Sequence, residues 1–158
     1  DSLRLMLAEL RHVRDVDAIV VTGDIADDGA VEAYTAVKEL VGEFARGLGA
    51  PVFYTTGNHD ERGAFGKVLG SGHPEPEAVL ESEAGERAAV STVAGRRFVT
   101  LDSLVPGKVY GRLSAAQLDW LKAVLSTPAE QGTVLALHHP PIALDISATQ
   151  PHFGLRRP

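Results

Sequence analysis

The apolar positions near the N-terminus follow two different periods. Leucine and valine recur there at helical spacing, at Leu3, Leu7, Leu10 and Val13. This spacing predicts an amphipathic helix from Ser2 onward. Residues 18–21 form a short β-branched apolar run that ends at Gly23, which predicts a buried strand. After a loop, the apolar face of residues 31–48 predicts a long second helix.

The alternation of strand and helix patterns continues along the chain. Residues 52–56 predict a second strand that ends at a glycine. In residues 61–87, glycine, proline and glutamate accumulate without a clear period, which predicts a surface excursion. The apolar runs 89–93 and 97–101 flank an Ala-Gly turn and predict a β-hairpin.

The C-terminal part predicts one further helix and one further strand. Ser114 and Gln117 form a capping box ahead of leucines at helical spacing, with Trp120 at the edge of the expected helix. Residues 133–137 predict a buried strand that ends before a double proline, because proline cannot donate to a sheet. The whole pattern predicts an α/β domain, residues 1–158, with a largely parallel central sheet and a hairpin.

Composition narrows the function classes. The chain has 158 residues, 44% of them hydrophobic, which indicates a folded domain rather than a disordered segment. Its net charge of -6 argues against a nucleic-acid binder, and an anionic substrate would need added cations. The absence of cysteine excludes disulfides, thiolate zinc sites and cysteine nucleophiles, and favours a cytoplasmic location. No apolar run approaches the ~20 residues of a membrane span.

Polar residues with metal-binding or proton-transfer chemistry follow the predicted strands. They are Asp24, Asn58 with His59 and Asp60, and His138 with His139. Ligands of open α/β sheets bind outside the carboxyl ends of the strands, so these loops can converge on one site. Taken singly, Asp24 fits an Asx turn and residues 57–60 fit a simple loop. An amide oxygen can also coordinate a cation, and an imidazole can donate a proton. His12 and His73 are expected at the surface, and His152 is left unassigned.

In combination these segments resemble the calcineurin-like metallophosphoesterases. The motifs are Gly23-Asp24-x-x-Asp27, Gly57-Asn58-His59-Asp60 and His138-His139-Pro140, in this order. Further segments are similar to the bacterial class III cyclic-nucleotide phosphodiesterases and their glycerophosphodiesterase relatives. They are Leu101-Asp102-Ser103, Gly111 and residues 117–121. The resemblance spans nearly the whole chain.

The resemblance implies an αββα sandwich and the hydrolysis of a small phosphodiester, 3',5'-cyclic AMP or a similar nucleotide. Water would be activated between two divalent ions, of iron, manganese or zinc. By position, Asp24 would bridge the ions, and Asn58 and His138 would bind the second. His59 would contact the phosphoryl group or protonate the leaving oxygen, with Asp60 as its orienting partner. Asp27 would organise the loop, and His139 would contact the ligands or the substrate. A homodimer is also implied.

The chain departs from the family pattern in two motifs. The family begins with Asp-x-His on its first strand and finishes with Gly-His-x-His, and neither occurs in this sequence. The expected sandwich is therefore incomplete, without the first strand motif and the C-terminal strands. Alternative functions are a glycerophosphodiesterase of the same fold and a binding scaffold that has lost metal chemistry. A serine hydrolase built on Ser71 or Ser103 lacks the Gly-x-Ser-x-Gly elbow.

Overall fold

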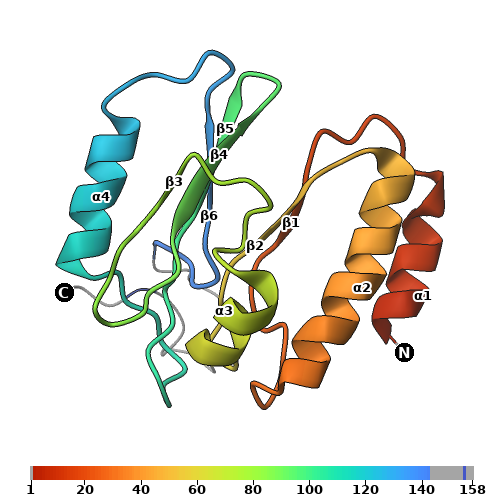
Figure 1. Ribbon diagram of the computed structural model, residues 1–158, viewed down its shortest axis with the longest axis horizontal. Helices are drawn as coiled ribbons and strands as arrows, with labels where there is room; N and C mark the ends of the chain where they lie inside the picture. Colours follow the sequence, from red (N-terminus) through yellow and green to blue (C-terminus); the bar gives the residue numbers. More distant parts are fainter. Residues whose placement is uncertain (1, 143–154, 156–158) are drawn as a thin grey trace.

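The structure, a computed structural model, describes residues 2–142 and Leu155 and contains two β-sheets (Figure 1). In the smaller sheet β1 (Ile19–Val21) and β2 (Val52–Tyr54) pair in parallel. The larger sheet has the order β3-β4-β5-β6. Its members are β3 (Ala78–Val79), β4 (Ala89–Val93), β5 (Arg96–Thr100) and β6 (Thr133–Ala136).

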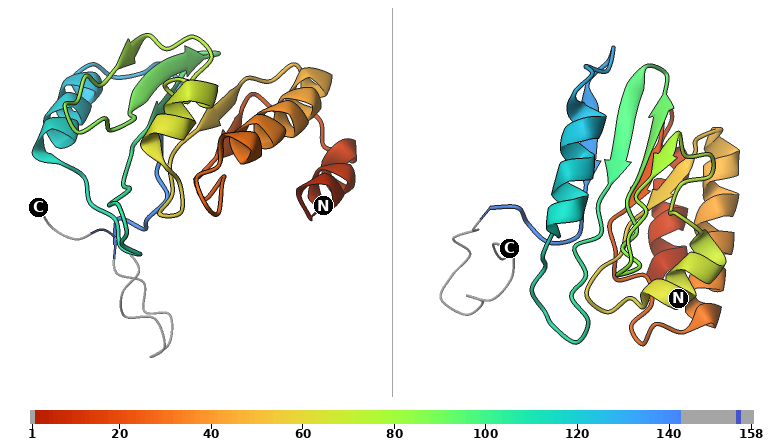
Figure 2. Two further views of the ribbon diagram at one scale, coloured as in Figure 1. Left: turned by 60° about the horizontal axis from the view of Figure 1, so that its bottom comes forward. Right: turned by 60° about the vertical axis from the view of Figure 1, so that its left-hand side comes forward.

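Helices cover the outer faces of the two sheets. α1 (Ser2–Glu9), continued by a 3-10 turn, Leu10–His12, lies with α2 (Val31–Leu48) beside the β1–β2 sheet. α4 (Ala115–Leu125) covers the larger sheet from the opposite side (Figure 2). The order of layers is helix, sheet, sheet, helix, so the expected αββα arrangement is confirmed. None of the described helices is long and apolar enough to cross a membrane.

Apolar side chains fill the spaces between these layers. Tyr34, Tyr54 and Phe65 are buried in one cluster beside the smaller sheet. Trp120 of α4 packs, as expected, against a second cluster, built around residues such as Val99. Each element therefore buries one face against a neighbour, as the helical and strand periods of the apolar positions predict.

The prediction of a single, largely parallel central sheet is wrong. Only β1–β2 and β5–β6 pair in parallel, and β3, β4 and β5 are antiparallel neighbours. The predicted hairpin is the reason: Ala94 and Gly95, with φ of 49° and 79°, reverse the chain between β4 and β5. Positive φ at both central residues matches the type I′ geometry that hairpins favour. The turn accounts for the antiparallel pairing of β4 and β5, and β1 and β2 form a sheet of their own.

The surface excursion predicted for residues 61–87 is also partly wrong, because it contains α3 (Arg62–Leu69) and β3. The Glu61 carboxylate caps α3 by accepting hydrogen bonds from Gly63 N and Ala64 N, 2.9 and 2.6 Å away. Phe65 is fully buried and anchors the helix. Glycines at 63 and 66 break the apolar period, which hides this short helix in the sequence.

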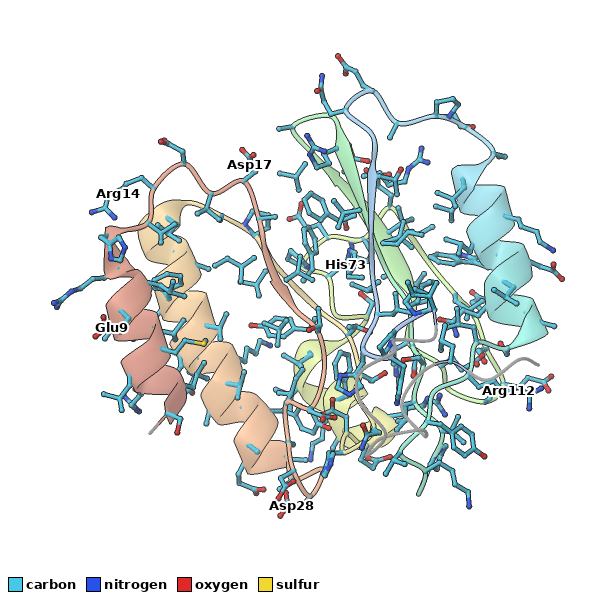
Figure 3. The ribbon with its side chains drawn as sticks, turned by 180° about the vertical axis from the view of Figure 1, so that it is seen from behind. Glu9, Arg14, Asp17, Asp28, His73 and Arg112 are labelled. Carbon is cyan, nitrogen blue, oxygen red and sulfur yellow. The ribbon has the colours of Figure 1, made fainter. Side chains whose placement is uncertain are left out.

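The prediction that His73 lies at the surface is wrong. The residue lies between the two sheets (Figure 3). Its ring nitrogens are 2.8 Å from Ser91 Oγ and 3.0 Å from Thr100 Oγ1. The ring also packs on Phe53, with centroids 4.5 Å apart. Burial lowers the pKa of His73 to about 4, so the ring is neutral near pH 7. His12, in contrast, is exposed as expected.

Candidate metal site

The loops after β1, β2 and β6 meet at one edge of the molecule and bring together Asp24, Asn58 and His138. His138 Nε2 lies 3.2 Å from Asn58 Oδ1. The same nitrogen lies 3.5 Å from Asp24 Oδ2. β1 and β2 are parallel neighbours, so their carboxyl ends lie side by side, and His138 reaches the same edge from the other sheet, after β6.

Close contact between the first two loops depends on glycine. A Cβ on Gly57 would lie 2.2 Å from Asp24 Oδ1 and 2.3 Å from Asp24 N. A Cβ on Gly23 would in turn lie 2.5 Å from Gly57 N. Asp24 itself has φ of 52°, the left-handed region that aspartate tolerates better than most residues. Glycine at both positions lets the Asp24 carboxylate reach the Asn58 loop.

The protonation of His138 suits it to bind a cation. Its Nδ1 lies 2.8 Å from the carbonyl oxygen of Thr22, and a carbonyl can only accept, so Nδ1 carries the hydrogen. In the neutral ring, Nε2 then presents a lone pair to the oxygens of Asp24 and Asn58. These atoms are all electron-pair donors, so they would repel one another unless a proton or cation lay between them. This set fits a divalent metal ion.

The donor set is mixed, with a carboxylate, an amide and an imidazole. Among residues 2–142, no three His, Cys, Asp or Glu side chains gather at metal-binding spacing. The amide of Asn58 supplies the remaining donor, and amide oxygens are ordinary ligands of hard cations. The described residues therefore offer three donors to one metal ion, and further coordination positions would remain for water or substrate.

His59 lies beside these donors and is half exposed. Its Nδ1 is 2.9 Å from Asp27 Oδ1, and its backbone N–H donates to Asp24 Oδ1 over 3.1 Å. The expectation that Asp60 orients the His59 ring is wrong, because Asp27 occupies that place. Sequence reasoning gave Asp27 only a loop-organising role. The Gly-Asp-x-x-Asp spacing was the signal that could have identified it.

Asp60 has a different, buried position. Its Oδ1 accepts hydrogen bonds from Ile25 N, Ala26 N and Tyr34 Oη, and its Oδ2 accepts one from Gly57 N. These donors come from the loops after β1 and β2 and from α2. Only 6% of Asp60 is exposed, so the carboxylate organises the loops and does not meet substrate.

His139, predicted to contact the ligands or the substrate, is 2% exposed and faces inward. Ser103 Oγ lies 2.8 Å from its Nδ1, and its ring stands edge-on to the His138 ring with centroids 4.9 Å apart. Burial, followed by the neighbouring His138, lowers the pKa of His139. A Cβ on Gly111 would collide with the ring, so glycine is needed there. His139 supports His138 and is shielded from substrate.

Asp102 is a buried anion that sequence reasoning did not place in the site. Arg62 Nε and Nη2 donate to its carboxylate over 2.7 and 3.2 Å, and Thr56 Oγ1 donates over 2.7 Å. The Gln117 side chain bonds to both the N–H and the carbonyl of the Asp102 backbone. The polar pair Asp102-Ser103 directly after an apolar run was the available sequence signal. These contacts fix the loop after β5 against the loop after β2.

A groove of about 490 Å³ opens beside the metal donors. His59 and Asn58 line this groove, and Leu104 and Pro106 contribute apolar surface to it. Glu61 also lines it, and its pKa is lowered by the amides of Gly63 and Ala64, so it is ionised near pH 7. The charged residues of its lining also include Asp28, Asp60 and Arg62, and the Arg62 guanidinium is paired with Asp102, so an anionic substrate would meet mainly acidic side chains. Bound cations would offset that charge.

Comparisons with known proteins identify the family of the chain. The family model described as calcineurin-like phosphoesterase matches residues 1–157. The chain belongs to this family. A cAMP/cGMP dual specificity phosphodiesterase of Mycobacterium tuberculosis is 44% identical over 135 residues, which cover 84% of this chain and 40% of that protein.

Other relatives carry related activities. The 3',5'-cyclic adenosine monophosphate phosphodiesterase CpdA of Escherichia coli K12 is 32% identical over 155 residues, 96% of this chain and 50% of the relative. The glycerophosphodiester phosphodiesterase GpdQ of Enterobacter lignolyticus is 29% identical over 147 residues, 92% of this chain and 50% of the relative. The chain thus spans half or less of the length of these relatives.

Proposed function

We propose that the complete protein hydrolyses phosphodiesters with bound divalent metal and that its substrate is a 3',5'-cyclic nucleotide. The observation that carries this proposal is the convergence of His138 Nε2 with the oxygens of Asn58 and Asp24, with His59 alongside. Relatives named as cyclic-nucleotide phosphodiesterases support the choice of substrate.

Asp24, Asn58 and His138 would hold a metal ion, and Asp24 would be shared with a second ion, each of iron, manganese or zinc. When bound, such ions neutralise a phosphodiester and lower the pKa of a water molecule. The chain's own part is to hold these donors in place: the Thr22 carbonyl fixes the His138 ring, and Gly57 admits the Asp24 carboxylate.

His59 would protonate the departing ester oxygen. Asp27 Oδ1 lies 2.9 Å from His59 Nδ1 and accepts its hydrogen. The imidazolium form of the ring would then give its Nε2 proton to the leaving oxygen and become a neutral imidazole that keeps the Nδ1 hydrogen. The backbone N–H of His59 also contacts the Asp24 carboxylate, which places the proton donor next to the metal ligands. We therefore assign proton donation to His59 and ring orientation to Asp27.

A glycerophosphodiester is the second candidate substrate, because GpdQ is among the relatives. The deciding experiment measures kcat/KM of the metal-loaded complete protein on 3',5'-cAMP and on glycerophosphoethanolamine. We expect preference for 3',5'-cAMP and loss of both activities on exhaustive chelation. Preference for the glycerol diester would select the second candidate. Metal-loaded protein without activity on either diester would support the third reading, a binding scaffold.

We further propose that the protein is a cytoplasmic homodimer. The cysteine-free sequence suits a compartment without disulfide formation, and the family resemblance implies the dimer. Light scattering of the purified protein and fractionation of the source cells test these points. A monomeric mass, or recovery outside the cytoplasm, would overturn the corresponding part.

A further inference from the structure

The Asp60 carboxylate joins the two metal-binding loops at positions adjacent to the ligands. Ile25 N, which follows Asp24, lies 3.0 Å from Asp60 Oδ1. Gly57 N, which precedes Asn58, lies 2.7 Å from Asp60 Oδ2. Charge-assisted hydrogen bonds of this kind are short and strong, so a shift of the carboxylate would move both loops.

The Tyr34 hydroxyl holds Asp60 from the helix side. It donates to Asp60 Oδ1 over 2.9 Å and accepts from Glu61 N over 2.9 Å. Tyr34 is in the first turn of α2 and is fully buried, with its ring edge-on to Phe65 at a centroid distance of 6.0 Å. Burial raises the pKa of Tyr34 far above its usual range, so the hydroxyl keeps its proton near pH 7.

From this network we propose that Tyr34 is a positioning residue for the metal site: through Asp60, its hydroxyl sets the separation of Asp24 and Asn58. The proposal rests on the metal site of the proposed function. The tyrosine is placed on a long helix, whereas the ligands are on loops, so the helix supplies the rigid reference. Without the hydroxyl, Asp60 and Glu61 N each lose a buried partner, and the loops lose their link to α2.

Removing this hydroxyl should weaken metal binding. Residues that support metal ligands typically change affinity by about 10- to 100-fold when mutated. We expect Tyr34→Phe to raise the Mn²⁺ dissociation constant of the complete protein by about 10-fold, the lower end of that range. Asp60→Asn should raise it further, because the amide group would turn a donor toward backbone N–H groups.

Tyr54→Phe is the matched control. Tyr54 is a buried tyrosine of the same apolar cluster, and within residues 2–142 no hydrogen bond joins its hydroxyl to either metal-binding loop. Calorimetric titration of metal-stripped proteins with Mn²⁺ gives the affinities, and thermal unfolding without metal gives the stabilities. We expect Tyr54→Phe to bind Mn²⁺ like the wild type, and saturating Mn²⁺ to restore much of the turnover of Tyr34→Phe.

The outcomes separate this inference from the proposed function. A wild-type protein that binds no Mn²⁺, Fe²⁺ or Zn²⁺ would overturn the metal site itself. Wild-type binding with an unchanged dissociation constant in Tyr34→Phe would overturn only the role of Tyr34. Failure of Tyr34→Phe to fold, while Tyr54→Phe folds, would assign the hydroxyl to folding and would also reject the proposal.

Discussion

Four histidines of this chain have different chemistry because their surroundings differ. His138 is fixed by a carbonyl on one nitrogen and presents the other to oxygen ligands. His59 is half exposed and paired with Asp27. His139 and His73 are buried, and burial lowers the pKa of each. All four residues are histidines, so we base the proposed roles, metal binding for His138 and proton donation for His59, on their partners and their burial.

We propose different roles for Asp24 and His59, so substitution of one should remove bound metal and substitution of the other should lower turnover. His59→Ala in the complete protein should lower turnover by about 10²- to 10⁴-fold, the usual contribution of a positioned acid or base, with metal content nearly unchanged. Asp24→Ala should instead lose metal, because it removes the carboxylate that faces His138 Nε2. Elemental analysis and steady-state kinetics check both. Equal metal loss in the two variants would contradict the separation.

The buried His73 should make stability depend on pH. Its pKa is about 4 in the folded state and near 6.5 when unfolded, so between these values the unfolded chain binds a proton that the native chain does not. Stability from this residue is complete above pH 6.5 and falls by about 1.4 kcal/mol per pH unit toward pH 4. Urea unfolding at pH 7 and at pH 5 gives the free energy of unfolding at each pH. The difference between the two values should be smaller for His73→Gln than for the wild type. The exposed His12→Gln should behave like the wild type, and an unchanged difference in His73→Gln would refute this account.

Much of the candidate site could be predicted at the residue scale, but the hydrogen-bond partners of its side chains could not. A distinctive order of motifs identified Asp24, Asn58 and His138, which the structure brings together. Sequence adjacency suggested that Asp60 orients His59, whereas the chain turns Asp60 inward to the amides of Ile25 and Gly57. Neighbours in sequence on a tight loop point in different directions, so pairing within a loop needs the three-dimensional path of the backbone.

At the element scale, ion pairing ties α3 to the end of β5. Arg62 begins α3, and its guanidinium bonds to the Asp102 carboxylate and to the Leu104 carbonyl. The Asp102 side chain is fully buried and that of Arg62 is 17% exposed. Most strands could be predicted because their apolar runs are continuous. β3 was missed because it has only two residues, and α3 was missed because glycines interrupt its pattern and its cap is a glutamate. Its stability comes from tertiary partners.

Loss of this pair should cost more than loss of a surface pair. Arg62→Ala leaves the Asp102 carboxylate buried without its cation, which should lower the free energy of unfolding by about 3 to 5 kcal/mol. Lys122→Ala breaks an exposed contact with Asp119 within α4. It should change the free energy of unfolding by at most about 0.5 kcal/mol. Urea denaturation of both variants beside the wild type measures the difference. Similar small losses in both would show that water solvates Asp102 once the arginine is gone.

At the scale of the whole molecule, the site lies where the two sheets meet. Asp24 and Asn58 follow strands of the smaller sheet, and His138 follows β6 of the larger one. Thr55 Oγ1 bonds to the Leu101 carbonyl over 2.6 Å across the same junction. Apolar runs look alike in one parallel sheet and in two packed sheets, so the sequence predicted the strands other than β3 but not their division between two sheets. Metal binding should therefore require both sheets to be packed.

The number of metal ions held by residues 1–158 alone follows from the same donors. Asp24, Asn58 and His138 can bind one metal ion. In the family pattern Asp24 would also bind the second ion, for which these three residues offer no further donor. A site with a single protein ligand should stay empty at ordinary metal concentrations, because affinity depends on ligand number and geometry. We expect calorimetric titration of this 158-residue chain with Mn²⁺ to give at most one site per chain. Two tight sites would instead mean that another segment supplies ligands, and His152, outside the described residues, would be the first to replace.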